Sequence, residues 1–302
     1  MTALAVLEHP LAPYQQWLAG QPLAARTRAT YAAQVAHYLR WLTRTGRRAG
    51  ADPLSLPHAR DHAIRDYKTY LKVEREASPR TVNLALAALD HFSRFLGLGQ
   101  PQVRREDLPA EAPRALAPNE QRRLLRTVER LAGVRDRALV ILFLYTGLRL
   151  SECAALDLRD VALSARKGHV TVRSGKGDTY REVPLNAEVR ARLEAWLARR
   201  AEVSQHRRTA APPQALWLAR HGGRLSPRSI DLVVRHVGQA AGFPLSAQIL
   251  RHTYLTNLVR QGNDLVLVAD LAGHRRLETT RRYSLPSAAD RVAAVEALAI
   301  EY

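Results

Sequence analysis

Four short stretches between residues 146 and 274 hold side chains that can contact an anion. They cover residues 146–152 (TGLRLSE), 174–177 (SGKG), 248–253 (QILRHT) and 271–274 (LAGH), and Tyr283 follows nine residues after the last one. Arg149 comes just after Gly147 at the start of a predicted helix, where unpaired backbone N–H groups favour an anion. An arginine can also contact a phosphate through two parallel N–H donors. Each stretch alone is common, so their order and spacing carry the signal.

The charge of the chain points to a polyanionic partner. Its 302 residues include 46 Lys and Arg against 28 Asp and Glu, which gives a formal net charge of +18 at pH 7. An excess of this size favours nucleic acid or an anionic membrane surface over a neutral small molecule. With 46% hydrophobic and 25% charged residues the chain can bury an ordinary core, so we expect a globular protein rather than a disordered basic tail.

Other features exclude several classes of protein. The start of the chain lacks the basic and apolar regions of a signal peptide, and the longest apolar stretch, 138–145, is too short to cross a bilayer. We therefore expect a cytoplasmic protein without a membrane span. Cys153 is the single cysteine, and the eleven histidines show no HExxH or HxH spacing, so we expect no disulfide, no metal and no cofactor.

Helical periodicity dominates the first third of the chain. Apolar residues recur at helical spacing over 11–98, and breaks rich in glycine and proline divide this region into about four predicted helices. Ser78 followed by Pro79 predicts the N-cap of a helix that ends at Phe95. Residues 100–118 hold four prolines and little periodicity, which is typical of an extended linker between domains.

The second part of the chain mixes helices with a small sheet. Two segments, 169–173 and 180–184, flank a glycine-rich turn that carries Lys176, which predicts a β-hairpin. Predicted helices cover 119–131 with Asn119 as the N-cap, 136–145, 187–201, 227–241, 246–261, 264–271 and 288–300. The predicted fold is therefore mainly α with a small β-sheet. We expect three parts, a helical domain, a linker and a second domain, at 1–107, 108–118 and 119–302.

The four stretches together resemble the motifs of the tyrosine recombinase (phage integrase) family, most closely those of Xer-like site-specific recombinases. The resemblance extends over nearly the whole chain, because Thr30, Tyr31 and residues 78–96 match places in the N-terminal domain of that family. It implies an N-terminal helical, SAM-like core-binding domain that binds DNA. A C-terminal tyrosine recombinase catalytic domain, with a C-terminal helix, would follow it.

The resemblance also implies a role for each matching residue. Arg149 and Arg251 contact the scissile phosphate and stabilise, without a metal, the charge that nucleophilic attack adds. Tyr283 is the nucleophile and forms a 3′-phosphotyrosyl bond, which keeps the energy of the broken DNA linkage. Lys176 is the general acid that protonates the departing 5′ oxygen, and His274 hydrogen-bonds the phosphate. Taken singly, each side chain has an ordinary structural alternative, such as a buried aromatic for Tyr283.

Three further residues accompany these groups. Glu152 lies three residues after Arg149 on one helix face and can hold that arginine in orientation. Gln248 stands where the family usually has His; it can donate to a phosphate oxygen but cannot hold a proton at neutral pH, so the general base is unassigned. His252 lies about 100° from Arg251 around a helix, so we expect a packing or supporting role. We expect cleavage to persist on the remaining groups.

The implied reaction is site-specific cleavage and exchange of DNA strands. The partner is double-stranded DNA and not a membrane, and the resemblance implies a homo- or hetero-tetramer on DNA, in the cytoplasm and associated with the nucleoid. The C-terminal helix, 288–300, would dock on a neighbouring protomer. Two alternatives stay open. One is a type IB topoisomerase that relaxes DNA without a defined site, and the other is a DNA-binding accessory protein with an impaired site, which Gln248 favours.

Overall fold

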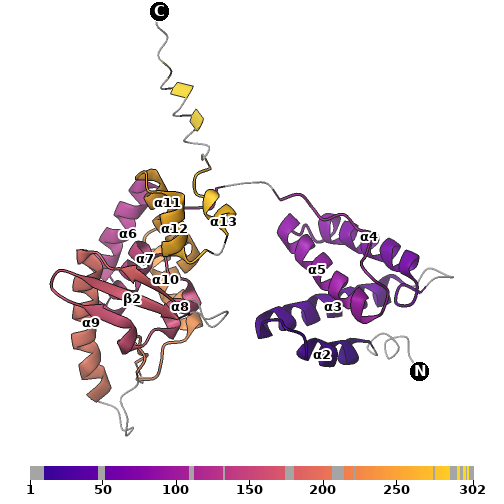
Figure 1. Cartoon of the computed structure of the whole chain (residues 1–302), viewed down its shortest axis with the longest axis horizontal. Helices are drawn as coiled ribbons and strands as arrows, with labels where there is room; N and C mark the ends of the chain where they lie inside the picture. Colours follow the sequence, from indigo (N-terminus) through magenta and orange to yellow (C-terminus); the bar gives the residue numbers. More distant parts are fainter. Residues whose placement is uncertain are drawn as a thin grey trace, which may run out of the picture. The chain divides into compact units, whose positions relative to one another are not determined.

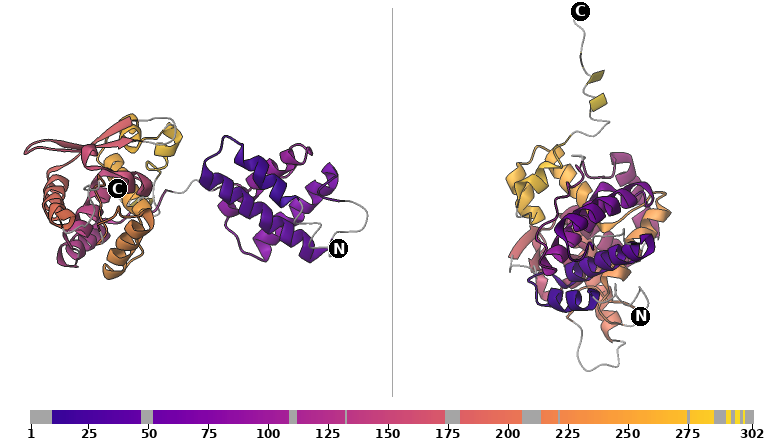
Figure 2. Two further views of the ribbon diagram at one scale, coloured as in Figure 1. Left: turned by 90° about the horizontal axis from the view of Figure 1, so that it is seen from below. Right: turned by 90° about the vertical axis from the view of Figure 1, so that its right-hand side faces the viewer.

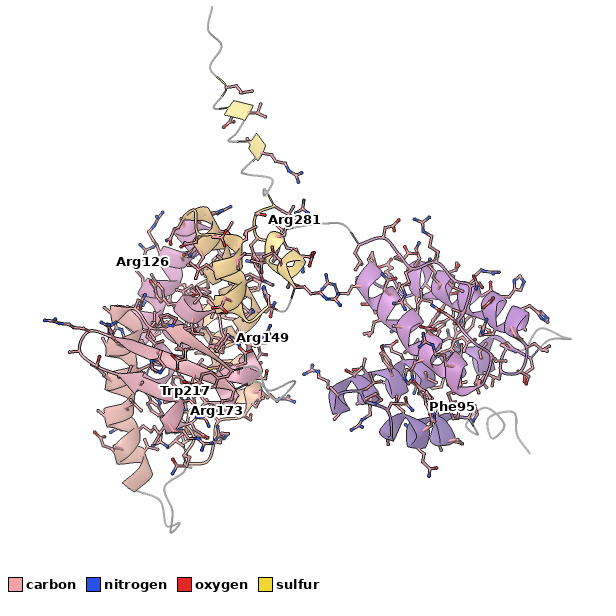
Figure 3. The ribbon with its side chains drawn as sticks, viewed as in Figure 1. Phe95, Arg126, Arg149, Arg173, Trp217 and Arg281 are labelled. Atoms are coloured by element: carbon pink, nitrogen blue, oxygen red, sulfur yellow. The ribbon has the colours of Figure 1, made fainter. Side chains whose placement is uncertain are left out.

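The computed structural model describes most of the chain as two compact units. The described residues are 10–46, 52–108, 112–131, 133–173, 180–205, 214–220, 222–274, 276–285, 291–292, 295–296 and 298. The first unit spans Met1–Pro109 and the second spans Ala110–Tyr302 (Figures 1 and 2). Phe95 packs on the core of the first unit, and Trp217 lies inside the core of the second (Figure 3). Each unit therefore has a hydrophobic core of its own.

The described part of the first unit is helical. Its helices are α2 (Leu11–Ala19), α3 (Ala25–Thr45), α4 (Pro57–Val73) and α5 (Pro79–Phe95). Their facing sides bury an aromatic core that includes Tyr14, Tyr67 and Phe92. Ser78 caps α5, because its hydroxyl accepts a hydrogen bond of 3.3 Å from the Thr81 N–H. The prediction of about four helices and the predicted cap are confirmed in these residues.

The segment that follows α5 is fastened to the first unit. The Glu106 carboxylate pairs with Lys68 (2.7 Å) and Lys72 (3.0 Å), both on α4. The Asn83 side chain of α5 exchanges two hydrogen bonds with the Glu106 backbone, each of 2.8 Å. Leu116 already belongs to the second unit, because its side chain is buried in the hydrophobic core of that unit. The described residues between these two anchors form no helix or strand.

One buried helix lies at the centre of the second unit. Every side chain from Ala138 to Leu144 in α7 (Val134–Thr146) is buried, and α7 packs against α9 (Ala187–Gln205) and α11 (Ala247–Arg260). A helix that is apolar on all sides needs such cover, which explains the unbroken apolar stretch in the sequence. The other described helices are α6 (Pro118–Leu131), α8 (Leu150–Ala155), the 3-10 turn η1 (Leu158–Asp160), α10 (Pro227–Ala240), α12 (Leu265–Ala272) and α13 (Leu277–Arg281).

A small antiparallel sheet completes the second unit. It consists, in spatial order, of β1 (Val161–Leu163), β2 (Gly168–Arg173) and β3 (Tyr180–Pro184). Arg173 pairs with Tyr180 at the end of the hairpin, and β3 packs against α12. The predicted hairpin is confirmed, whereas the three-residue β1 was not predicted. The turn that carries Lys176 lies outside the described residues.

Some predicted helix ends differ from the structure. Asn119 is not the N-cap of α6, because the helix begins at Pro118 and the Glu120 carboxylate accepts the Ala117 N–H (2.9 Å). Proline suits a first helical position, where no N–H is needed. α13 was not predicted, because its five residues are too few to show a helical periodicity. Of the predicted helix at 288–300, only four helical residues and Leu298 are described.

Among the residues that the structure describes, no helix is both long and apolar enough to cross a bilayer. Three large apolar side chains that the structure describes in the C-terminal segment are exposed to solvent in this chain. They are Val292, Val295 and Leu298.

Candidate active site

Gly147 allows Arg149 to start a new helix at the surface of the second unit. α7 ends at Gly147, whose φ of 60° lies in the left-handed region. A Cβ atom there would lie 2.5 Å from Tyr254 Cδ1, so only glycine fits between the helix end and this ring. The chain then turns at once into α8, with Arg149 at its N-cap position. The Arg149 side chain is 42% exposed and is therefore accessible to a ligand.

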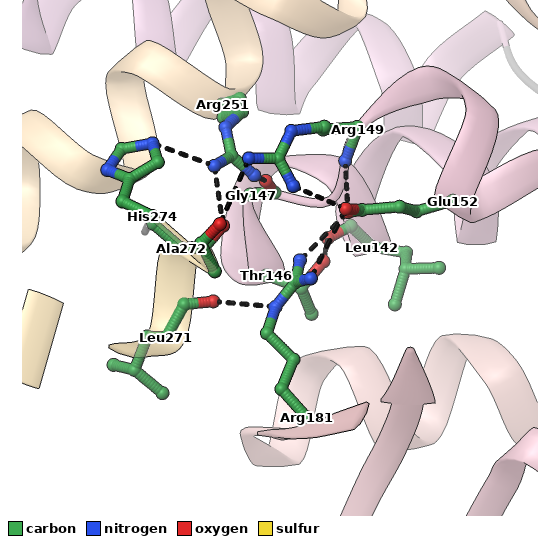
Figure 4. Close-up of polar contacts among 11 residues, drawn as sticks. Leu142, Thr146, Gly147, Arg149, Glu152, Arg181, Arg251, Leu271, Ala272 and His274 are labelled. Atoms are coloured by element: carbon green, nitrogen blue, oxygen red, sulfur yellow. Dashed lines mark hydrogen bonds and ion pairs between the residues drawn. The ribbon is translucent and has the colours of Figure 1, made fainter. Parts of the chain in front are cut away.

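Glu152 holds two guanidiniums at once. Its carboxylate accepts hydrogen bonds from Arg149 Nη1 (2.6 Å) and from the Arg149 N–H (2.8 Å). It also accepts from Arg181 Nη2 (2.8 Å) and Nη1 (3.2 Å) (Figure 4). Burial opposes ionisation of Glu152, but the hydrogen bonds from Arg181 and Arg149 lower its pKa to about 2. The predicted contact with Arg149 is present, and the carboxylate stays ionised at neutral pH.

Arg181 is a member of this cluster that the sequence analysis missed. It lies on β3, is nearly buried, and donates from Nε to the Leu271 carbonyl (3.2 Å) as well as to Glu152. A Cβ atom on Gly273 would lie 2.8 Å from Arg181 Nη1, so the glycine leaves the space that this guanidinium occupies. A single arginine in a short strand carries no signal of such a contact, because the strand pattern does not say which element covers it.

Arg251 is a buried cation whose hydrogen-bond partners are neutral. It lies on α11, is 3% exposed, and donates from Nη1 to the Gly147 carbonyl (2.5 Å) and from Nη2 to the Ala272 carbonyl (2.6 Å). Nη2 also lies 3.0 Å from His274 Nε2. Burial, followed by the charge of Arg149, lowers the pKa of Arg251 to about 10. The side chain therefore stays protonated at neutral pH without a bound counter-charge.

The contacts of His274 define its tautomer. An arginine can only donate, so Nε2 accepts from Arg251, and Nδ1 carries the proton and donates to Thr280 Oγ1 (2.8 Å). Burial, followed by the charges of Arg251 and Arg149, lowers the pKa of His274 to about 4. The ring is therefore neutral at pH 7 in the DNA-free chain. Thr280, which fixes this tautomer, is a second residue that the sequence analysis missed.

Tyr283 follows α13 directly and lies beside these cations. Its side chain is 6% exposed, and its ring is nearly parallel to that of His274, with centroids 6.2 Å apart. Burial raises the pKa of the phenol, while the charges of Arg251 and Arg282 act in the opposite direction. The phenol, the imidazole and the buried guanidinium thus belong to one cluster in a single unit of the chain.

His252, for which a packing or supporting role was expected, contacts Tyr283. Its Nδ1 lies 2.8 Å from Tyr283 Oη, and its Nε2 lies 2.9 Å from the amide nitrogen of Gln248. This contact was not predicted, because the sequence pattern does not show that the residues following α13 cover the face of α11 next to Arg251. Gln248 is exposed in the first turn of α11, and within the described residues its recorded contact is with His252 rather than with an arginine.

The structure brings most of the predicted groups together. The guanidiniums of Arg149 and Arg251 lie side by side, with His274 on one side and Glu152 on the other (Figure 4). Arg149 Nη2 donates to the Gly273 carbonyl (3.2 Å), so both guanidiniums meet the end of α12. Two like charges this close repel each other, and an anion between them relieves the repulsion. The cluster is therefore suited to binding a phosphate.

Comparison with known proteins gives a consistent result for both units. Residues 114–289 match the model of the phage integrase family, and residues 13–97 match that of the phage integrase N-terminal SAM-like domain. Tyrosine recombinase XerC of Myxococcus xanthus is 34% identical over 245 residues, which are 76% of this chain and 79% of the relative. Tyrosine recombinase XerA of Pyrococcus furiosus is 29% identical over 221 residues, 72% of this chain and 74% of the relative.

A solved structure shares the fold. The XerH site-specific recombinase bound to difH substrate, in a pre-cleavage complex, superposes with a TM-score of 0.70 at 21% identity, over 89% of this chain and 79% of that one. The match of the family model covers more than half of the chain and includes every element of the site described above. The chain belongs to the phage integrase family, the tyrosine recombinases.

Proposed function

We propose that this protein is a site-specific DNA recombinase that cleaves and rejoins DNA strands through a covalent 3′-phosphotyrosyl intermediate. The relatives named above are tyrosine recombinases, and the XerH structure contains its difH substrate. The observation that carries the proposal is the position of Tyr283 within a cluster of two guanidiniums and a neutral imidazole.

The cluster matches the charge that develops during attack on a phosphodiester. Nucleophilic attack at phosphorus places additional negative charge on the non-bridging oxygens, and fixed guanidiniums stabilise that charge without a metal. Arg251 is held by two carbonyls and Arg149 by Glu152, so neither has to reorganise when the phosphate arrives. The imidazole of His274 lies beside the Arg251 guanidinium, with its Nε2 facing Arg251. It can donate to the phosphate after protonation or a change of tautomer.

The reaction consumes no external energy source. Tyr283 Oη forms a bond to phosphorus while the bond from phosphorus to the 5′ oxygen breaks, and the 5′ oxygen takes a proton. We assign that proton to Lys176, which lies outside the described residues. A 5′ hydroxyl then attacks the phosphotyrosine, which reverses the first step and releases Tyr283. Strand exchange results when the attacking hydroxyl belongs to a second duplex.

The proposed partner is double-stranded DNA bound by both units. The net charge of +18 supports strong phosphate contact, so we expect affinity to fall steeply with added salt. We assign core DNA binding to residues 1–107, the linker to 108–118 and catalysis to 119–302. Two duplexes require a tetramer of identical or paired recombinases on DNA, and such a substrate places the protein at the nucleoid.

The exposed apolar side chains of the C-terminal segment support assembly. Val292, Val295 and Leu298 are 56%, 67% and 71% exposed in the single chain. Their spacing places them on one side of a helix, which favours contact with another protein surface. We assign this segment to docking on a neighbouring protomer in the DNA-bound assembly.

The formation of a covalent adduct between Tyr283 and DNA tests the proposal. A nicked duplex that carries the sequence selected by the protein from a random library is incubated with the wild type, Tyr283→Phe and Tyr180→Phe, and the products are separated on a denaturing gel. Tyr180 is a matched control, because its side chain is exposed on β3. We expect an adduct with the wild type and with Tyr180→Phe, and none with Tyr283→Phe.

Two other outcomes identify the alternatives. Binding without any adduct would make the protein a DNA-binding accessory protein. An adduct on every duplex, together with relaxation of any supercoiled plasmid, would make it a type IB topoisomerase. Adduct formation restricted to the selected site supports the recombinase.

A further inference from the structure

His252 connects the nucleophile to Gln248. Its Nδ1 lies 2.8 Å from Tyr283 Oη and its Nε2 lies 2.9 Å from Gln248 Nε2, so both ring nitrogens are engaged. The phenol must lose its proton when it attacks phosphorus, and the amide of Gln248 cannot take it. An imidazole in contact with the phenolic oxygen can accept that proton.

We propose that His252 Nδ1 accepts the phenolic proton of Tyr283, and that the orientation of the Gln248 amide selects the tautomer of His252 that can do so. His252 is then a catalytic residue, because it touches a reacting atom. Gln248 is a positioning residue that acts through His252. This inference rests on the recombinase function proposed above.

The two orientations of the amide correspond to two tautomers. In the structure the Gln248 amide nitrogen faces Nε2, which therefore accepts, so Nδ1 carries the proton and donates to Tyr283 Oη. Rotation of the amide by half a turn presents Oε1 instead. Nε2–H then donates to Oε1, and the lone pair of Nδ1 faces the phenolic O–H. The first state holds the phenol at rest, and the second prepares it for attack.

The proton balance closes over the full reaction. During cleavage the Oη–H bond breaks, the proton moves to Nδ1, the Oη–phosphorus bond forms and the bond to the 5′ oxygen breaks. The imidazolium is stabilised because Nε2–H donates to Gln248 Oε1. The 5′ oxygen takes its proton from the general acid, assigned above to Lys176. During rejoining both protons return, so no co-reactant is consumed.

The surroundings keep His252 neutral until DNA binds. Arg251 faces it from α11, Tyr283 and Arg282 from the end of α13, and His274 from the end of α12. Burial, then the charges of Arg282 and Arg251, lowers the pKa of His252 to about 4, so Nδ1 is available as an acceptor at neutral pH. A phosphate bound at the guanidiniums adds negative charge nearby and raises this pKa, which makes the imidazole a stronger base in the complex.

His252→Asn tests the proton transfer. Asparagine keeps an amide that can hydrogen-bond Tyr283 but cannot accept a proton. We expect single-turnover cleavage of the nicked duplex at pH 7 to slow by about 10²-fold, the lower end of general base effects. We also expect the rate of the variant to keep rising with pH, by up to tenfold per unit, because direct ionisation of the phenol replaces the base. The wild-type rate should instead rise with pH only until His252 has lost its proton (the acid limb of the profile) and then become independent of pH.

Fluorotyrosine in place of tyrosine at position 283 should partly restore the cleavage rate of His252→Asn. Its phenol ionises at lower pH than that of tyrosine, so the gap between wild type and His252→Asn should shrink. His236→Asn, an exposed histidine on α10, serves as the matched control and should keep the wild-type pH profile. A His252→Asn profile that is parallel to the wild type, with no rescue, would overturn the assignment of the base.

Gln248→Glu tests whether residue 248 selects the tautomer of His252. It also tests the proposal if His252→Asn no longer binds DNA. A carboxylate can only accept, so it fixes Nε2–H and raises the pKa of His252. We expect the acid limb of the pH profile to move to higher pH, and an unmoved limb would refute the role of Gln248. If the wild type forms no Tyr283 adduct, the proposed function has failed. If it forms one and neither variant alters the profile, only this inference has failed.

Discussion

Two buried arginines, one in each unit, differ in what neutralises them. Arg60 on α4 is 4% exposed and donates to the Asp61 carboxylate from Nε (3.0 Å) and Nη2 (2.8 Å). Arg251 is as deeply buried, but it donates to two carbonyls and an imidazole, none of which carries a negative charge. The charge of Arg60 is compensated by a carboxylate, whereas no hydrogen-bond partner of Arg251 compensates its charge.

The comparison shows why burial alone does not identify a functional arginine. Arg60 also donates to the carbonyls of Leu98 and Gly99, so it fixes the chain that leaves α5. A buried charge without a counter-charge costs stability, and it persists where a ligand supplies the missing charge. Opposite effects on stability and activity should therefore separate the two residues.

Arg251→Met should give the largest effect on activity. Removal of one fixed donor to the transition state slows the chemical step by about 10³-fold. The melting temperature should stay the same or rise, because an apolar side chain replaces a buried uncompensated cation. Single-turnover cleavage and thermal unfolding measure the two effects. A variant that lost activity and thermal stability together would place Arg251 in the same class as Arg60.

Arg60→Met should act on stability instead. It leaves the Asp61 carboxylate buried with the Gln102 N–H (3.2 Å) as its remaining recorded contact. We expect a loss of about 3 kcal/mol in the free energy of unfolding of the first unit. Hydrogen exchange of the α4 and α5 amides should accelerate, while the cleavage rate at saturating DNA changes little. Unchanged exchange would show that the Arg60–Asp61 pair is dispensable.

Glu152→Gln should give a smaller, pH-dependent effect. Folding lowers the pKa of Glu152 from 4.5 to about 2, so its ionised form stabilises the fold above pH 4.5, and this contribution disappears as the pH falls toward 2. The variant should therefore be less stable at pH 7 and lose less stability on acidification than the wild type. Thermal unfolding across this range measures the difference. Parallel curves would mean that the carboxylate does not stabilise the fold through its charge.

The sequence predicted the parts of the site that depend on local order. Arg149 follows a helix end that Gly147 marks, and His274 follows another glycine, so their positions could be expected from short motifs. Arg181, Thr280 and the contact of His252 could not, because each depends on packing between elements far apart in the chain. Periodicity locates a helix but does not say which neighbour covers each face.

The same limit applies to the elements themselves. Long amphipathic helices such as α3 and α5 were predicted, because a pattern repeated over several turns is unambiguous. β1 and α13 have three and five residues, so neither repeats a pattern. Both owe their existence to partners, β1 to the edge of β2 and α13 to α12.

Gly273 has a consequence for how mutations in this protein should be judged. It ends α12 at a φ of 63°, its carbonyl accepts from Arg149, and the space above it holds Arg181. One added methyl group would strain the backbone at this φ and displace the Arg181 guanidinium, which shares the Glu152 carboxylate with Arg149. Such an allele would keep every predicted reacting side chain and still alter the contacts around Arg149, so an inventory of those side chains would not detect it.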